Sequence, residues 1–262
     1  MTEILRVEGL AKMFGGLCAV SDVSFNLNHK EIVGLIGPNG AGKTTLINLI
    51  SGAIQPTRGR ILFNGRDISK AKAHEVNNLG IARTFQVVRI FAKLTVLENV
   101  LAGLVDRRSK GPWHLAKDAI FGPAGALVED RDACRRAEEL LEFVGIGRYR
   151  KELAENLPYA LTKRLEIARA MATAPKLLLL DEPSSGLNPA ELMGQIALIN
   201  EINRRDVSIL IIEHVMKVIM DISHRLIVLD YGEKIAEGVP EEVCSNPKVI
   251  DAYLGGGAHA AH

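Results

Sequence analysis

The sequence has few of the features that mark disulfide-bonded, zinc-binding or membrane-spanning proteins. Its three cysteines, Cys18, Cys134 and Cys244, are widely spaced and form no CxxC pair, so neither a disulfide framework nor a zinc site is predicted. No apolar run approaches the roughly 18 to 20 residues that a membrane-spanning helix needs, and Met1–Ile4 does not begin a signal-peptide pattern. We therefore expect a globular protein of a reducing compartment, which would work at a membrane only by docking onto another subunit.

An excess of charge of either sign is also missing. The formal net charge is +1, because 32 Lys and Arg residues nearly balance 31 Asp and Glu residues. This balance gives no electrostatic reason to expect a nucleic acid as a partner. The 262 residues, of which 47% are hydrophobic, suffice for one large α/β domain or two small ones with a sizeable core.

Alternating strand and helix patterns predict an α/β fold with a mostly parallel sheet covered on both faces. Half-buried strands are indicated by alternating apolar and polar side chains in the first two segments, and buried strands by the later apolar runs. The expected strands are Leu5–Gly9, Val20–Leu27, Glu31–Ile36, Arg60–Phe63, Lys176–Leu180, Ser208–Ile212 and Leu226–Asp230. The expected helices are Thr44–Gly52, Arg131–Val144, Arg164–Ala172 and Glu191–Arg204.

The middle of the chain differs from the rest. Thr95 and Glu98 have the spacing of a capping box before an apolar helical run. Residues 106–125, with two Gly-Pro pairs and the single Trp113, are interpreted as an irregular insertion in a mainly helical region. The glycine-rich tail, 256–262, is expected to be disordered.

A phosphate-binding motif follows the third expected strand. The run GPNGAGKTT matches GxxxxGK[ST] in full, between a buried strand and an apolar helix. Its glycines let the backbone wrap a phosphate chain, and N–H groups at a helix N-terminus favour anions. Lys43 would reach the β- and γ-phosphates and the Thr44 hydroxyl would ligate Mg²⁺, the alternative being a chance glycine-rich turn. The predicted nucleotide-binding residues are Gly37, Pro38, Asn39, Gly40, Ala41, Gly42, Lys43, Thr44 and Thr45.

Two later strands end in polar side chains that suit the same chemistry. Asp181 and Glu182 follow a fully apolar strand, and His214 follows the next one. Carboxyl ends of parallel strands meet at the ligand-bearing edge of a sheet. Asp181 would hold Mg²⁺ directly or through water, and Glu182 would orient and deprotonate the attacking water. His214 would hydrogen-bond the γ-phosphate, although a structural histidine and a solvated acidic pair are the alternatives.

Together with these motifs, further features resemble the ATP-binding subunits of ABC transporters. Gln86 stands where that family has a glutamine that ligates Mg²⁺, assists catalysis and touches the membrane subunit. Phe14 stands where the family stacks an aromatic ring on adenine, although a Phe here could also be core. Residues 157–171 correspond to the signature motif and its helix, and 184–189 to a loop that acts across a dimer.

The resemblance covers residues 4–255 and implies both a fold and partners. It implies a P-loop NTPase fold in one domain, 1–255, with an antiparallel β portion and a helical subdomain inserted at about 87–170. ATP and Mg²⁺ are the implied cofactors. A second ATPase subunit, transmembrane permease subunits and, indirectly, a solute-binding protein are the implied partners. The implied location is the cytoplasmic face of the cell membrane, through the permease.

Narrower features resemble the branched-chain amino acid transporter ATPases. These are the FGGL run at 14–17, the GLNP run at 186–189, the long insertion near 103–130 and the ending NPKVIDAYL at 246–254. Branched-chain amino acids are therefore the default solute, with urea, short amides and other amino acids as alternatives. The sequence does not choose among them, because the solute is selected by other subunits.

The signature motif departs from the family pattern. The family has LSGGQ, or LSYGQ in this subfamily, where this chain has Leu157-Pro158-Tyr159-Ala160-Leu161. In the family, the serine hydroxyl and the glycine amides of this motif bind the γ-phosphate held by the partner, and Pro158 has neither a hydroxyl nor an N–H. We therefore expect weakened hydrolysis in a homodimer and favour a heterodimer with a subunit whose signature is complete. Neutral drift with near-normal activity is the alternative.

Two other functions fit the motifs less well. An ABC ATPase of DNA repair or translation usually has two such domains or a long coiled-coil insertion, and this chain has neither. A non-hydrolysing module, in which ATP only holds a dimer together, would not need Glu182 or His214. Weak, ATP-gated binding owing to the altered signature is the remaining alternative.

Overall fold

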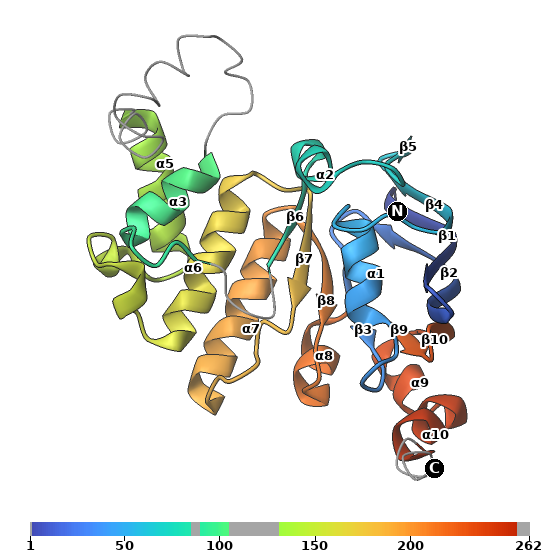
Figure 1. Ribbon diagram of the computed structural model, residues 1–262. Helices are drawn as coiled ribbons and strands as arrows, with labels where there is room; N and C mark the ends of the chain where they lie inside the picture. Colours follow the sequence, from blue (N-terminus) through green and yellow to red (C-terminus); the bar gives the residue numbers. More distant parts are fainter. Residues whose placement is uncertain (1, 85–89, 105–130, 256–262) are drawn as a thin grey trace. The chain divides into compact units, whose positions relative to one another are not determined.

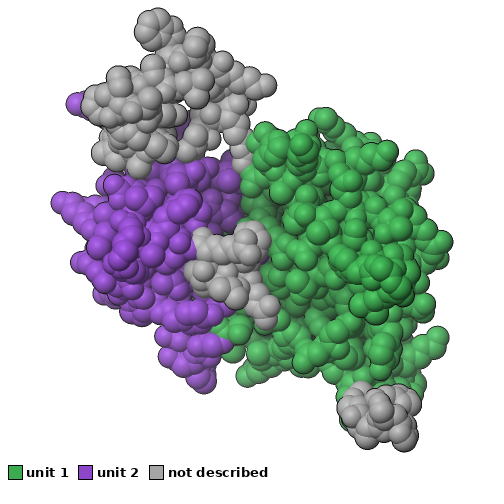
Figure 2. Space-filling view, in the orientation of Figure 1, with its two compact units in different colours: residues 1–83, 176–185, 192–262 green, residues 84–175, 186–191 purple. Residues whose placement is uncertain are grey.

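The structure is a computed structural model that describes residues 2–84, 90–104 and 131–255. Its chain forms two compact units, which we describe separately (Figure 2). Unit 1 comprises residues 1–83, 176–185 and 192–262, and unit 2 comprises 84–175 and 186–191. The predictions for Gln86, for the insertion at 106–125 and for the tail at 256–262 lie outside the described residues.

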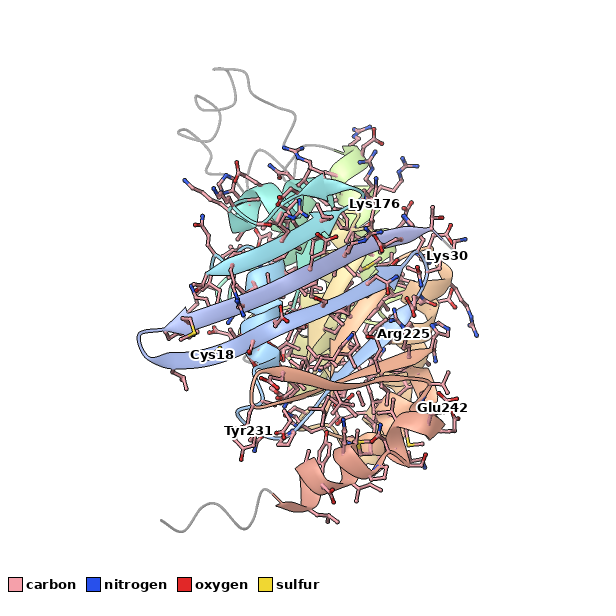
Figure 3. The ribbon with its side chains drawn as sticks, turned by 90° about the vertical axis from the view of Figure 1, so that its right-hand side faces the viewer. Cys18, Lys30, Lys176, Arg225, Tyr231 and Glu242 are labelled. Carbon is pink, nitrogen blue, oxygen red and sulfur yellow. The ribbon has the colours of Figure 1, made fainter. Side chains whose placement is uncertain are left out.

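Unit 1 contains an antiparallel sheet with the strand order β2-β1-β4-β5. Its strands are β1 (Glu3–Phe14), β2 (Leu17–Asn28), β4 (Arg58–Phe63) and β5 (Arg66–Asp67). Figure 3 shows β1 and β2 side by side, with Cys18 near the turn that joins them. Both strands run further than predicted, because shifts of register let pairing continue past Gly9, which has φ +55°.

The second sheet of unit 1 contains the predicted buried parallel strands. Its order is β10-β9-β3-β8-β7-β6, and only β10 runs antiparallel to its neighbour. The strands are β3 (Ile32–Ile36), β6 (Ile81–Arg83), β7 (Leu177–Asp181), β8 (Ser208–Ile212), β9 (Arg225–Asp230) and β10 (Glu233–Gly238). Every residue of β3, β7 and β8 is buried, as expected for strands covered on both faces.

Helices cover this sheet because alternate side chains of each strand point to opposite faces. One face of β3, β7, β8 and β9 joins the antiparallel sheet and α1 (Lys43–Ile50) in one hydrophobic core. On the other face, a Cβ added at Gly34 would lie 2.7 Å from Ile219 of α8 (Met216–Ile222), so the glycine allows that helix to pack closely. The other helices are α2 (Ala73–Leu79), α7 (Pro189–Arg204), α9 (Pro240–Cys244) and α10 (Pro247–Gly255) (Figure 1).

Unit 2 is helical in the residues that the structure describes. It contains α3 (Val96–Leu104), α5 (Arg131–Phe143) and α6 (Tyr159–Ala172), with short 3-10 turns at Gly147–Tyr149 and Ala154–Asn156. The capping box at the start of α3 is confirmed: Thr95 N–H donates to Glu98 Oε2 at 2.7 Å, and Glu98 N–H donates to Thr95 Oγ1 at 3.2 Å. The fold class predicted from the sequence is thus confirmed in its parallel, antiparallel and helical parts.

Candidate nucleotide-binding site

The loops after three parallel strands meet at one edge of the large sheet. In the strand register, Leu35 is opposite Ile212, and Ile212 is opposite Asp181. The residues that follow, from Gly37, Glu182 and Glu213 onward, therefore leave the sheet side by side. The predicted phosphate loop, acidic pair and histidine all lie at this edge.

The phosphate loop connects β3 to α1 through glycines with unusual backbone conformations. Gly37, Gly40 and Gly42 have φ values of +148°, +82° and +97°. A Cβ at Gly37 would lie 2.0 Å from a backbone carbonyl oxygen of β9, and one at Gly42 would lie 2.4 Å from the Ala19 carbonyl oxygen. Only glycine fits at both positions. The curved path of this loop therefore depends on these two glycines.

Lys43 is held inside this loop. Its Nζ donates to the carbonyl oxygens of Gly37 and Pro38 at 2.7 and 2.8 Å, and the residue is 6% exposed. Burial lowers the pKa of the Lys43 ammonium, while the carboxylates of Glu182 and Asp181 act in the opposite direction. Both carboxylates are thus close enough to interact electrostatically with the Lys43 ammonium, as the predicted site requires.

Asp181 is the last residue of β7 and is 2% exposed. Arg83 at the end of β6 donates Nη2 to Asp181 Oδ2 at 3.0 Å and Nη1 to Asn48 Oδ1 at 2.5 Å. Burial raises the pKa of Asp181, and the Arg83 guanidinium opposes that rise. Arg83 therefore connects the acidic pair to α1, the helix that follows the phosphate loop.

Glu182 and His214 face each other across the two loops. Their side chains lie 2.9 Å apart, from Glu182 Oε1 to His214 Nε2, and Glu182 is held at φ +51°. A glutamate in this left-handed region is strained, and such strain is frequent at functional sites. The contact gives a carboxylate with a fixed direction at the edge where the phosphate loop begins.

The remaining predicted residues occupy varied environments. Phe14 ends β1 and is 48% exposed, with Lys12 Nζ 5.2 Å from its ring centroid.

Thr44 is exposed and Thr45 half-buried in the first turn of α1. A hydroxyl and a buried carboxylate match the oxygen ligands that Mg²⁺ takes beside nucleotide phosphates, so the donor set at Thr44 and Asp181 fits this ion.

The altered signature motif begins a helix of unit 2. Pro158 is the N-cap residue of α6, with φ −53° and ψ 147°, and its carbonyl accepts from Leu161 N–H at 2.9 Å. Tyr159 is 48% exposed, and its ring lies against Gly186. Proline is compatible with the first turn of a helix, so the substitution leaves the helix intact.

Sequence reasoning overlooked three residues near these loops. They are Arg83 and Glu213, which hydrogen-bond Asp181 and Ser184, and Tyr253, whose pKa is raised by burial while an interaction with the Gly37 backbone opposes that rise. Glu213 could have been noticed because it directly precedes His214. The other two come from distant segments, β6 and α10, and no local pattern links them to the phosphate loop.

Comparison with known families defines the class of this protein. A family model described as "ABC transporter" matches residues 20–185, and one described as "Branched-chain amino acid ATP-binding cassette transporter" matches 233–259. The chain belongs to the ABC transporter family and is one of its ATP-binding, ATP-hydrolysing proteins.

Individual relatives narrow this class. The chain is 44% identical over 254 residues to the high-affinity branched-chain amino acid transport ATP-binding protein LivG of Salmonella typhimurium, covering 96% of this chain and 98% of LivG. It is 42% identical over 253 residues to BraF of Pseudomonas aeruginosa, which has the same description, with the same coverage of both chains.

A solved structure agrees with this relationship. The ADP conformation of MJ1267, an ATP-binding cassette of an ABC transporter, matches with a TM-score of 0.85 and 33% identity, over 97% of this chain and 100% of MJ1267.

Among the residues that the structure describes, no helix has the length and apolar character needed to cross a bilayer.

Proposed function

We propose that this chain is the ATP-hydrolysing subunit of an importer for branched-chain or related amino acids. The names of LivG and BraF support this solute class, as does the C-terminal match at 233–259. The observation that supports hydrolysis most directly is the 2.9 Å contact between Glu182 and His214 at the sheet edge where the phosphate loop begins.

Each predicted residue has a role in this proposal. The backbone N–H groups of residues 37–45 and the Lys43 ammonium bind the phosphates, and Phe14 stacks on adenine. Thr44, Asp181 and Gln86 hold Mg²⁺, which when bound neutralises charge on the phosphate oxygens. Glu182 takes the proton of the attacking water, and His214 keeps Glu182 in position and bonds the γ-phosphate.

Replacing Glu182 tests the hydrolytic part. Glu182→Gln removes the proton acceptor but keeps the shape, so ATP binding should persist while turnover falls by about 10² or more. The variant should also accumulate an ATP-bound dimer. Glu242→Gln, an exposed change on α9, is the matched control and should behave like wild type. Rapid turnover by Glu182→Gln would show that another group is the base.

Contact with a permease involves the start of unit 2 in this proposal. Residues 85–99 follow the end of β6 and include Gln86, so they link the nucleotide site to the helical part. Phe91 is 50% exposed and offers an apolar side chain to a membrane subunit at the cytoplasmic face. Cysteines introduced between 90 and 99 should cross-link to the permease, whereas cysteines on the antiparallel sheet should not.

The working dimer is proposed to be heteromeric. In such dimers the signature motif of each subunit contacts the nucleotide bound to the other subunit. Pro158 and Ala160 would therefore weaken the site on the partner. The nucleotide on this chain's own phosphate loop would be contacted by the partner's complete signature. A lost hydrogen bond to a charged acceptor is worth roughly 1.5 to 3 kcal/mol, or about 10 to 150-fold. Two copies of this chain would weaken both sites.

Phosphate release distinguishes these arrangements. The chain alone should turn over slowly, addition of the partner ATPase should restore turnover, and Pro158→Ser, Ala160→Gly and Leu161→Gln together should raise the homomeric rate. Equal turnover by the chain alone and by the mixture, with no effect of the triple change, would mean neutral drift. Slow turnover under every condition would favour an ATP-gated module.

A further inference from the structure

Three consecutive residues at the end of β8 each hold the loop that contains Glu182. Glu182 N–H donates to the Ile212 carbonyl oxygen at 3.0 Å, and Ser184 N–H donates to Glu213 Oε1 at 2.8 Å. His214 Nε2 then meets Glu182 Oε1 at 2.9 Å. The loop after β7 is thus attached to the neighbouring strand by its backbone at two points and by its catalytic side chain at a third.

The middle attachment is the unusual one, because it uses a buried carboxylate. Glu213 is 3% exposed and Ser184 is 4% exposed. A buried carboxylate is unfavourable unless it accepts hydrogen bonds, and a bond from a backbone N–H to such a group is shorter and stronger than a neutral one. An apolar residue would fill this position at lower cost if only packing were needed.

The position of this bond relates it to the geometry of Glu182. Glu182 has φ +51°, a conformation that a glutamate keeps only when its surroundings enforce it. The Glu213 bond fixes the backbone two residues beyond Glu182, and the Ile212 bond fixes Glu182 itself. The exposed contact to His214 cannot do this alone, since the imidazole is 44% exposed.

We propose that Glu213 is a positioning residue that holds the loop of Glu182 in its strained conformation and so aims the Glu182 carboxylate at the attacking water. This inference rests on the proposed role of Glu182 as the base. In this proposal Glu213 acts through the backbone of Ser184, whose N–H donates to Glu213 Oε1. A misplacement of about 1 Å in a reacting group can lower a rate by about 10²-fold, so the contribution of Glu213 belongs to kcat and not to ATP affinity.

Three substitutions at this position separate the acceptor from the charge. Glu213→Gln keeps an acceptor oxygen for Ser184 N–H and removes the charge, so kcat should stay within about threefold of wild type. Glu213→Ala removes the acceptor and should lower kcat by about 10 to 100-fold, with the ATP dissociation constant and KM within about threefold. Glu213→Asp keeps the charge, but its side chain is one methylene shorter, so its carboxylate oxygens no longer reach the Ser184 N–H. Its kcat should therefore be as low as that of Glu213→Ala.

The measurements are steady-state phosphate release in the assembly that supports wild-type turnover, ATP binding by calorimetry, and the melting temperature of each variant. If Glu213→Ala does not fold, the comparison of Glu213→Asp with Glu213→Gln decides. A wild-type kcat for the alanine or aspartate variant would overturn the proposal. So would a parallel loss of kcat and ATP affinity, which indicates general disruption, or a glutamine variant as slow as the alanine variant, which indicates a role for charge.

Glu182→Gln in the same series separates this proposal from the proposed function. If Glu182→Gln turns over rapidly, the assignment of the base is wrong, and the positioning of Glu182 is without consequence. If Glu182→Gln is slow while Glu213→Ala is fast, only the positioning role is wrong.

Discussion

Removal of the Arg83 side chain should destabilise the protein, because the buried carboxylate of Asp181 loses the hydrogen bond and the positive charge of the guanidinium. Arg83 and Asp181 are 9% and 2% exposed at the side chain and lie 3.0 Å apart. Breaking such a pair from one side costs about 3–5 kcal/mol, since the remaining charge stays desolvated. Lys43 also interacts with the Asp181 carboxylate and offsets part of this cost. We therefore expect Arg83→Met to lower the free energy of unfolding by about 3 kcal/mol, the lower end of that range. For a chain of this size that corresponds to a drop in Tm of about 6–12 °C.

The assay is thermal unfolding without nucleotide, with two comparisons. Arg83→Met combined with Asp181→Asn should recover more than half of the loss, because a neutral amide is less costly to bury than a carboxylate that has lost its guanidinium. Arg6→Met removes a surface ion pair to Glu3, in which the arginine is 51% exposed, and should shift Tm by no more than about 2 °C. The reasoning is refuted if Arg83→Met shifts Tm no more than Arg6→Met does, or if the double variant is as unstable as Arg83→Met.

Four further changes test other parts of the structure. Lys43→Ala should abolish tight ATP-Mg²⁺ binding in calorimetry, because the phosphates lose the side-chain cation of the loop; unchanged affinity would contradict the phosphate-loop assignment. Gly37→Ala should prevent nucleotide binding, because its Cβ would lie 2.0 Å from a carbonyl oxygen of β9. Asn99→Leu should speed hydrogen exchange at residues 91–95 of unit 2, since Asn99 is fully buried and bonds the backbone of Phe91 in both directions, at 2.9 and 3.0 Å. Burial raises the pKa of Glu31, but hydrogen bonds, chiefly from Arg225, bring it below the ordinary value of 4.5; its stabilisation is therefore complete above about pH 4.5 and lost as the pH falls through the lower folded value. Glu31→Gln should accordingly flatten the acid limb of a plot of stability against pH.

Strong local patterns made most of the large sheet predictable. The apolar runs of β3, β7 and β8 are buried throughout, and their residue ranges differ from the predicted ones by at most a residue at either end. The phosphate loop could be predicted because a full motif stood between a strand and a helix. The acidic pair and His214 followed from the rule that parallel strands deliver their carboxyl ends to one edge.

Elements without a local pattern were missed. The three-residue strand β6 is too short for periodicity, and it forms because β7 offers an open edge to Ile81–Arg83. The edge strand β10 has no buried residue and reads EKIAEG, which resembles a loop. Its hydrogen bonds to β9 and the contact of Glu237 with Arg225 depend on distant partners. The same reason applies to the Arg83–Asp181 pair, whose members are 98 residues apart.

The hairpin of β1 and β2 gives this protein a built-in attachment point for a spectroscopic label. Cys18 pairs with Met13 across the hairpin, next to the pair of Phe14 and Leu17. Cys18 is exposed, whereas burial raises the pKa of the Cys244 thiol and slows its alkylation. A maleimide dye would therefore react faster at Cys18, at the strand end that also contains Phe14, than at Cys244, and its emission would report on the adenine stacking that we propose for Phe14 without any engineered cysteine.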